Sequence, residues 1–214
     1  MTLFDSDRKL LPPRELLPRD GSAMFYEWVL GDLDDSQLFR DLDENIPWES
    51  RTIKMFGKEH PQPRLVAWFG DPGRSYSYSN VAMNINPWTP LLEKLKSICE
   101  EKSGSSFNSL LLNKYRNGED KVSWHADNEP ELGNEPCIAS LSLGATRRFK
   151  FRHCDSKQVV ECRLPSGSLV VMSGLSQSKW IHEVPKEMGV KEPRINLTFR
   201  SVRASQRALE SQLP

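Results

Sequence analysis

The sequence predicts an α+β fold in which helices come first and many short antiparallel strands then form a sandwich or distorted barrel. The main observation is a change of hydrophobic period: helical spacing extends to residue 104, and short alternating runs begin near residue 107. The second observation is size, because 214 residues with 37% hydrophobic and 27% charged residues can bury a large core. There is no internal repeat, so a repeat architecture is not expected.

The N-terminal segment has two parts with different composition. Residues 1–20 place three prolines among alternating charges, and we expect them to form a flexible tail. Residues 23–30 (AMFYEWVL) are mostly apolar, and we expect them to form a strand or a buried extended segment.

Two helices are expected before the strands begin. Asp35 and Ser36 offer an N-cap for the first helix, which should end before Pro47. The second helix is the clearest in the chain, because Thr89 can cap it, Pro90 suits its first position and Gly104 can end it.

The second half reads as strands, and one of them shows the pattern most plainly. Phe149 and Phe151 alternate with basic residues, as expected for a sheet with one apolar face. The expected strands lie near residues 107–115, 121–125, 137–143, 147–153, 158–164, 167–173 and 194–203. We therefore divide the chain into a tail (1–20), an N-terminal extension (21–105), a strand-rich core (106–204) and a C-terminal tail (205–214).

Charge and composition exclude some classes of protein. Residues 1–50 hold five Lys/Arg and twelve Asp/Glu, and the rest hold 24 and 17, so a mildly basic body follows an acidic lead-in. This balance permits a nucleic-acid partner without demanding one. The four cysteines form no CxxC pair, which argues against structural zinc.

Localisation is predicted from segments that the chain lacks. No apolar run approaches the ~20 residues of a membrane span, and the acidic N-terminus does not resemble a signal peptide. We expect an intracellular protein with no membrane partner, in the nucleus if the organism is eukaryotic and otherwise in the cytoplasm. Nothing demands a dimer, so a monomer is expected.

A candidate metal site is the most informative motif. His125 and Asp127 are two residues apart at a predicted strand end, so their side chains leave the same face, and His182 can approach from a distant strand. Two imidazoles and one carboxylate form the ligand set of non-haem Fe(II) oxygenases. An isolated His-x-Asp is usually not a metal site, so the assignment needs a second feature.

That feature is the strand that begins at Arg194. Arg194, Asn196, Thr198 and Arg200 fall on one face, and burying such a face is costly unless an anion binds there. The alternative is an exposed edge strand with a charged outer face. Together with the upstream metal motif, a bidentate arginine clamp for carboxylates is the better explanation.

These motifs together resemble the AlkB group of Fe(II)/2-oxoglutarate dioxygenases. The resemblance rests on His-x-Asp, the distal His182, the segment RINLTFR at 194–200 and the segment NKYRN at 113–117, and it extends from about Trp48 to Arg203. Within the group the chain looks closest to eukaryotic AlkB homologues two and three, because of residues 107–117 and 138–147. The resemblance implies a double-stranded β-helix (jelly-roll) core, N-terminal helices and a nucleotide-recognition lid within residues 21–105.

The resemblance also implies cofactors and a reaction. His125, Asp127 and His182 would be the catalytic iron ligands, and Fe(2+), 2-oxoglutarate and O2 would be required. The distal carboxylate of 2-oxoglutarate would bind Arg194, helped by Asn113 and Tyr115; Arg200 would hold the end nearest the metal, with Asn196 on the same face. Such enzymes oxidise an N-methyl group of a damaged base (1-methyladenine or 3-methylcytosine), releasing formaldehyde, succinate and CO2.

Substrate-binding residues are expected around a flipped-out base. By resemblance Trp48, Tyr76 and Tyr78 would line the base and its phosphate, although a single aromatic residue is more often part of a core. An acidic group would select a cationic lesion. The best-known repair homologues have a second carboxylate directly after the metal-binding Asp, whereas this chain has Asn128, so Glu129 is the nearest acid.

Duplex DNA is a possible substrate because of one further motif. Met55-Phe56-Gly57-Lys58 resembles the hairpin finger of homologue two, and Phe56 would fill the space that the flipped base leaves. The alternative is a strand with Phe56 in the core. Basic side chains would add phosphate contacts: Lys54, Lys58, Arg64, Arg74, Arg147, Arg148, Lys150 and Arg152.

The sequence therefore predicts a DNA-repair demethylase that acts on alkylated DNA, single- or double-stranded. Three alternatives remain at this stage: an RNA demethylase with the same chemistry, a protein-hydroxylating dioxygenase, and an inactive dioxygenase fold that only binds nucleic acid.

Overall fold

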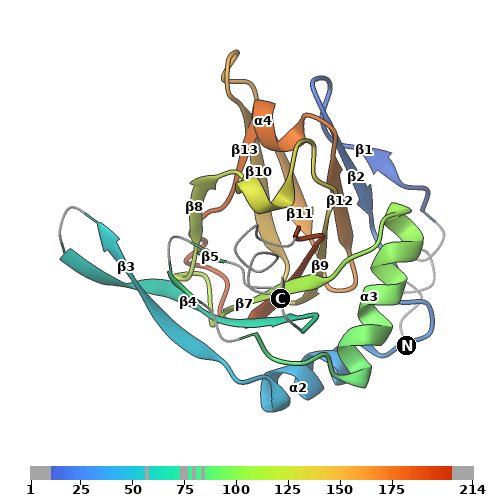
Figure 1. Cartoon of the computed structure of the whole chain (residues 1–214), viewed down its shortest axis with the longest axis vertical. Coiled ribbons are helices and arrows are strands. Elements are labelled where there is room, and N and C mark those ends of the chain that lie inside the picture. The colour runs from blue at the N-terminus through green and yellow to red at the C-terminus, as the bar shows by residue number, and fades with distance from the viewer. Residues whose placement is uncertain (1–10, 56–57, 73–76, 79–80, 83–84, 204–214) are drawn as a thin grey trace, which may run out of the picture.

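Two antiparallel sheets face each other in the computed structural model, which describes residues 11–55, 58–72, 77–78, 81–82 and 85–203 (Figure 1). Among these residues the larger sheet has eight strands in the order β1-β2-β12-β9-β14-β7-β4-β3, and the smaller has four in the order β11-β10-β13-β8. This arrangement confirms the predicted α+β class and agrees with a jelly-roll.

The element bounds are as follows. The larger sheet contains β1 (Arg14–Glu15), β2 (Ser22–Tyr26), β3 (Glu49–Met55), β4 (Lys58–Gly70), β7 (Ser109–Tyr115), β9 (Ile138–Gly144), β12 (Leu169–Ser173) and β14 (Arg194–Arg200). The smaller sheet contains β8 (Val122–His125), β10 (Arg147–His153), β11 (Val159–Leu164) and β13 (Trp180–Val184). The remaining elements are β5 (Ser77–Tyr78), β6 (Val81–Ala82), α2 (Asp35–Asn45), α3 (Pro90–Ser103), α4 (Ser176–Lys179) and the 3₁₀ turn η1 (Pro130–Leu132).

Helices α2 and α3 cover one face of the larger sheet. Their buried residues, including Leu42 and Leu95, pack in one cluster with Leu197 and other residues of the sheet. The caps of α3 are as predicted, with Thr89 at the N-cap and Gly104 at the C-cap in a left-handed conformation. The N-cap of α2 was predicted one residue too late. It is Asp34, whose extended backbone lets its carboxylate accept from two backbone N–H groups of the first turn.

The N-terminal segment is attached to the body of the protein over part of the expected tail. Strand β1 pairs with β2, and Leu16 and Leu17 are buried, so residues 14–17 depart from the expectation of a flexible tail. The two leucines pack in a hydrophobic cluster with Phe25 and other buried residues, and this burial holds the segment in place. Residues 1–10 lie outside the described residues.

Strands from both sides of residue 105 share the larger sheet. Strand β2 pairs with β12, and β4 pairs with β7. The strand expected over residues 23–30 ends at Tyr26, although Val29 and Leu30 beyond it are buried. The division of the chain at residues 20, 105 and 204 stays a prediction.

Strand β14 is central, and this position creates the polar wall of the site. It pairs with β7 on one side and β9 on the other, and all seven of its residues are buried. Ile195, Leu197 and Phe199 join the core under the helices. The edge-strand alternative is therefore wrong, and the polar residues of β14 face the smaller sheet.

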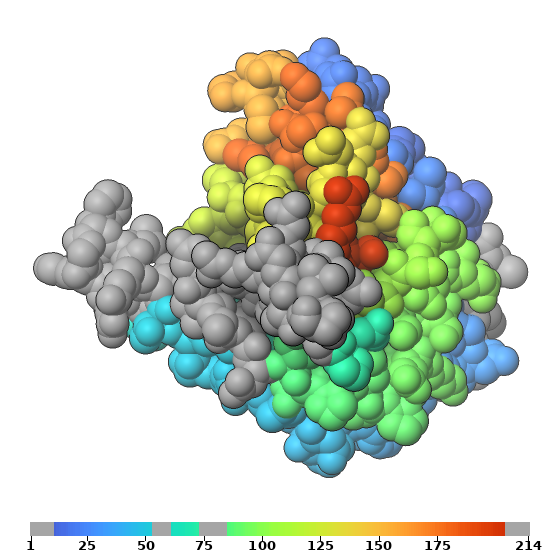
Figure 2. All heavy atoms as spheres, viewed as in Figure 1, coloured from blue at the N-terminus to red at the C-terminus, as the bar shows by residue number. Residues whose placement is uncertain are grey.

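The described chain ends on the surface. Ser201–Arg203 lie between the green segment that contains α3 and the yellow segment that contains η1 (Figure 2), and the N–H of Arg203 donates to the carbonyl of Glu131. Within the described residues no helix is long and apolar enough to cross a membrane.

Candidate metal and co-substrate site

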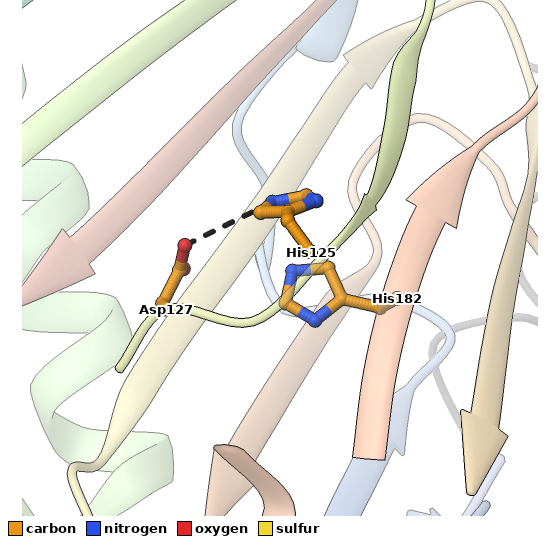
Figure 3. A group of neighbouring side chains, drawn as sticks. All are labelled: His125, Asp127 and His182. Atoms are coloured by element: carbon orange, nitrogen blue, oxygen red, sulfur yellow. Dashed lines mark ion pairs between the residues drawn. The ribbon is translucent and has the colours of Figure 1, made fainter. Parts of the chain in front are cut away.

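Three potential metal ligands converge between the two sheets (Figure 3). His125 ends β8 and lies opposite His182 of β13 in the antiparallel register, with ring centroids 4.3 Å apart. Asp127 follows in the loop, and its Oδ1 is 3.8 Å from Nε2 of His125. One potential ligand atom from each residue lies within 4.8 Å of the others. Strand pairing thus brings together two histidines 57 positions apart, as the motif predicted.

The protonation states of these side chains suit a divalent cation. Nδ1 of His125 lies 2.8 Å from the carbonyl of Ser123, and a carbonyl can only accept, so the proton sits on Nδ1 and Nε2 is free to ligate. Burial, aided by repulsion from His125, lowers the pKa of His182 to about 3, so its imidazole is neutral at pH 7. Metal binding requires neutral imidazoles.

Asp127 is held as a carboxylate. Burial alone would raise its pKa, but Arg200 and the two histidines together lower the pKa well below its ordinary value. Its Oδ2 accepts a hydrogen bond of 2.7 Å from Nη2 of Arg200, and both side chains are almost fully buried. The site therefore presents one fixed negative charge on Asp127, a neutral imidazole at His182 and the Nε2 atom of His125.

A cavity of about 40 Å³ adjoins the three ligands. Its polar lining includes four of the five residues expected to hold the co-substrate, namely Asn113, Tyr115, Asn196 and Arg200, together with Thr198. Arg194, the fifth, is not part of the lining. The same lining contains Arg64 and Ser140, whose place in a site the sequence reasoning missed. Strand β9 alternates serine with leucine, and that pattern could have indicated Ser140; no local signal indicates Arg64.

Arg194 lies beside this cavity with its charge incompletely satisfied. It is 1% exposed, and its guanidinium carbon lies 5.2 Å from the centroid of the Tyr115 ring. Nη2 donates to Oγ of Ser142 at 2.9 Å, whereas Nε and Nη1 are buried without a hydrogen-bond partner among the described residues. Unsatisfied buried donors on a cation fit a carboxylate ligand.

The pKa of Arg194 reflects this environment. Burial lowers the pKa to about 10; repulsion from Arg147 adds to the effect, and the nearby Tyr115 opposes it. The guanidinium therefore remains charged at neutral pH.

The two asparagines are already engaged by protein groups. Oδ1 of Asn113 accepts from Nε of Arg64 at 2.7 Å. Nδ2 of Asn196 donates to Ser140 and to the carbonyl of Leu141, while its Oδ1 accepts from Thr198. These bonds fix the polar wall before any ligand binds.

The expected substrate residues are placed less completely. Trp48 is half-buried at the margin of the helix-covered core, and its Nε1 donates to the carbonyl of Asp43. Glu129 follows the metal loop, and its Oε2 is buried without a hydrogen-bond partner among the described residues. Neither residue lines the cavity. Phe56 and Tyr76 lie outside the described residues, and for Tyr78 only the backbone, in β5, is described.

Two expected phosphate contacts are wrong. Arg147 and Arg64 are 1% and 7% exposed, so neither guanidinium is available at the surface. Arg147 instead donates to the carboxylate of Glu187 and to three backbone carbonyls. Sequence cannot distinguish a surface arginine from a buried one whose partners lie far along the chain.

The fold and the site define a class of non-haem iron oxygenase, and comparison with known proteins agrees. The model of the 2OG-Fe(II) oxygenase superfamily matches residues 22–200. The chain therefore belongs to this superfamily and, within it, to the AlkB family. The family implies Fe(2+), 2-oxoglutarate and O2, and the convergent triad and the unsatisfied Arg194 fit the first two.

The relatives are AlkB homologues. The chain is 47% identical over 175 residues to "Alpha-ketoglutarate-dependent dioxygenase alkB homolog 3" of Bos taurus, covering 77% of this chain and 60% of that protein. It is 35% identical over 197 residues to "DNA oxidative demethylase ALKBH2" of Mus musculus, covering 87% of this chain and 82% of that protein. The chain thus matches only about three fifths of the length of the homolog 3 proteins.

A solved structure supports the fold alone. "The structure of OsALKBH1" aligns with a TM-score of 0.63 over 89% of this chain and 100% of that chain, at 18% sequence identity. At that identity the likeness supports the jelly-roll arrangement and leaves the substrate open.

Proposed function

We propose that this protein oxidatively removes N-alkyl groups from nucleobases in DNA as a step of alkylation repair. The observation that carries the proposal is the combination of a His/Asp/His triad with a buried cation, Arg194, which has unsatisfied donors and lies against Tyr115 of the same cavity lining. The names of the relatives, which include DNA oxidative demethylases, supply the substrate class.

Each residue of the site would have a definite task. His125 through Nε2, the carboxylate of Asp127 and His182 would hold Fe(2+), which when bound supplies the activation of O2 that the oxidation requires. Arg194 would pair with the distal carboxylate of 2-oxoglutarate, with Tyr115 beside it. Arg200 holds Asp127 ionised and would place positive charge near the other end of the co-substrate.

The surroundings would keep the reaction from water. Phe149 lies 5.3 Å, centroid to centroid, from the His182 ring, and Val184 and Leu111 line the same cavity. Such an apolar wall limits solvent at the metal and favours neutral imidazoles. The protein's contribution is therefore orientation, charge and exclusion of water.

The experiment is an assay of the purified protein with Fe(II), air, 2-oxoglutarate and oligonucleotides that carry 1-methyladenine or 3-methylcytosine. Matched single-stranded DNA, duplex DNA and RNA are compared, with methyl loss followed by mass and succinate measured in parallel. We expect one succinate per methyl lost, with DNA preferred. His125→Ala, at a partly exposed position, should fold and be inactive. A preference for RNA would overturn the DNA assignment, and 2-oxoglutarate turnover without methyl loss would overturn the substrate class.

Glu129 is the residue we propose for selecting a cationic lesion. Its carboxylate would favour the positive charge of 3-methylcytosine over a neutral base such as 3-methylthymine. Glu129→Gln should therefore reduce the preference for 3-methylcytosine over 3-methylthymine. An unchanged preference would mean that this acid plays no part in selection.

A further inference from the structure

Gln177 lies outside every motif discussed above, yet it makes a direct hydrogen bond to the backbone of Asp127. It belongs to the short helix α4 (Ser176–Lys179) and is 3% exposed. Its Oε1 accepts from the N–H of Asp127 at 2.9 Å, and both groups are buried. The amide orientation follows from chemistry, because the opposite orientation would set an NH₂ group against an N–H.

The other end of the Gln177 amide is also fixed. Nε2 donates to Oγ of Ser176 at 3.2 Å and to Sδ of Met172 at 3.5 Å. Helix α4 itself is pressed against the N-terminal segment, since a Cβ on Gly21 would lie 2.4 Å from the backbone nitrogen of Ser176. Gln177 is therefore a rigid acceptor with few alternative rotamers.

Asp127 needs such a support because no strand carries it. Strand β8 ends at His125, and Asp127 lies in the loop that follows. Two buried hydrogen bonds hold the residue, one at its carboxylate from Arg200 and one at its N–H to Gln177. With the backbone and the carboxylate both fixed, the second carboxylate oxygen can point only toward the histidines.

The position of Gln177 in the chain adds a connection between two ligands. Helix α4 leads directly into β13, which carries His182 five residues after Gln177. The hydrogen bond from Asp127 thus ties the loop of one ligand to the segment of another.

We propose that Gln177 is a positioning residue that orients Asp127 for metal binding. The inference rests on the metal site proposed above. Removing the acceptor should leave the three ligands present but let the Asp127 loop move, and loss of such a supporting contact typically weakens metal binding by about 10- to 100-fold.

The test compares two substitutions at this position with a matched control. Gln177→Met keeps the unbranched shape and removes the acceptor, whereas Gln177→Glu keeps an acceptor oxygen. The control is Gln158→Met, because Gln158 is exposed and its side chain accepts from the exposed Arg19 and from no other described residue. The probe is Co(II), titrated into metal-free protein and followed by its visible absorption.

We expect Gln177→Met to bind Co(II) about 10- to 100-fold more weakly than the unmodified protein. Gln177→Glu and Gln158→Met should bind within about threefold of it. Hydrogen exchange of the Asp127 amide in the metal-free protein should accelerate at least about tenfold in Gln177→Met only, because that proton loses its acceptor.

Four results would separate the possible failures. Equal Co(II) affinity in folded Gln177→Met would overturn the positioning role and leave the metal site intact. A lowered melting temperature with unchanged affinity would assign Gln177 to packing alone, which also overturns it. If Gln177→Met does not fold, Gln177→Glu decides, since a tenfold loss there contradicts the proposal. Absence of Co(II) binding in the unmodified protein would instead refute the metal site.

Discussion

Arg147 and Arg194 are both 1% exposed and both lie near the ring of Tyr115, with guanidinium carbons 5.5 and 5.2 Å from its centroid. Arg147 donates from all three nitrogens, to Glu187 and to the carbonyls of residues 117, 120 and 185. Arg194 has an acceptor on one nitrogen only among the described residues. Burial alone therefore does not identify a binding residue; the number of unsatisfied donors does.

The hydrogen bonds of Arg147 hold two loops together. The segment after β7 and the segment after β13 meet there, and Gly118 exchanges backbone hydrogen bonds with residues 187 and 190. Strands β8 and β14 start from these loops and carry His125 and Arg194. Arg147, whose three nitrogens all donate, thus supports the two loops, whereas Arg194 retains donors that a ligand could use.

The largest expected change in the free energy of unfolding comes from removing the hydrogen bonds of Arg147. Arg147→Met should lower the free energy of unfolding by about 3 kcal/mol, because three carbonyls lose their donor and the buried Glu187 loses a partner. Urea unfolding of the metal-free protein measures it. Arg148→Met is the matched control, since that partly exposed arginine also pairs with Glu187 but should cost at most about 1 kcal/mol. Similar losses of unfolding free energy in both variants would contradict the role of Arg147 in holding the two loops together.

Arg194→Met should give the opposite pattern. Affinity for 2-oxoglutarate should fall by about 10- to 100-fold with the loss of charge-assisted hydrogen bonds. The ligand-free protein should be equally or more stable, because an unsatisfied buried charge is replaced by an apolar chain. Calorimetric titration and urea unfolding give the two numbers. Destabilisation as large as that of Arg147→Met would erase the distinction between the two arginines.

Gly118 tests the same contact between the two loops through the backbone. A Cβ on Gly118 would lie 1.7 Å from the carbonyl oxygen of Glu187, whereas a Cβ on Gly189 would meet nothing within 4 Å. Gly118→Ala should therefore cost about 2 kcal/mol through forced displacement of the loop. Gly189→Ala, two residues beyond Glu187, should leave the stability nearly unchanged. Equal stabilities for the two variants would show that the loops meet loosely.

A pH-dependent effect concerns His182, a third buried basic group, which is kept neutral. Its pKa is about 3 in the folded protein against an ordinary 6.5, so between these values the unfolded chain binds more protons. Stability of the metal-free protein should be complete above pH 6.5 and fall below it by up to about 1.4 kcal/mol per pH unit. His182→Leu should remove that part of the slope. An identical slope in both proteins would mean that other groups cause the acid sensitivity.

Local pattern was sufficient for the bounds of one helix and for two of the three candidate metal ligands. Helix α3 begins and ends where Thr89, Pro90 and Gly104 predicted, because a capping residue acts through its own backbone and its near neighbours. His125 and Asp127 could be singled out by a spacing of two. Where a signal was local but duplicated, the prediction shifted by a residue, as with Asp34 in place of Asp35 at the start of α2.

The sequence by itself determined which residue types and periods were available: two helices, a series of short strands, a His-x-Asp motif and a strand with alternating arginines. Tertiary structure decided what each charge does. Arg194 became central because β14 inserts between β7 and β9, and Arg147 became structural because acceptors up to 40 residues away surround it. Gln177 accepts a hydrogen bond from the backbone of Asp127, which lies 50 positions earlier in the chain. Hydrogen-bond satisfaction depends on such distant partners, which no local pattern specifies.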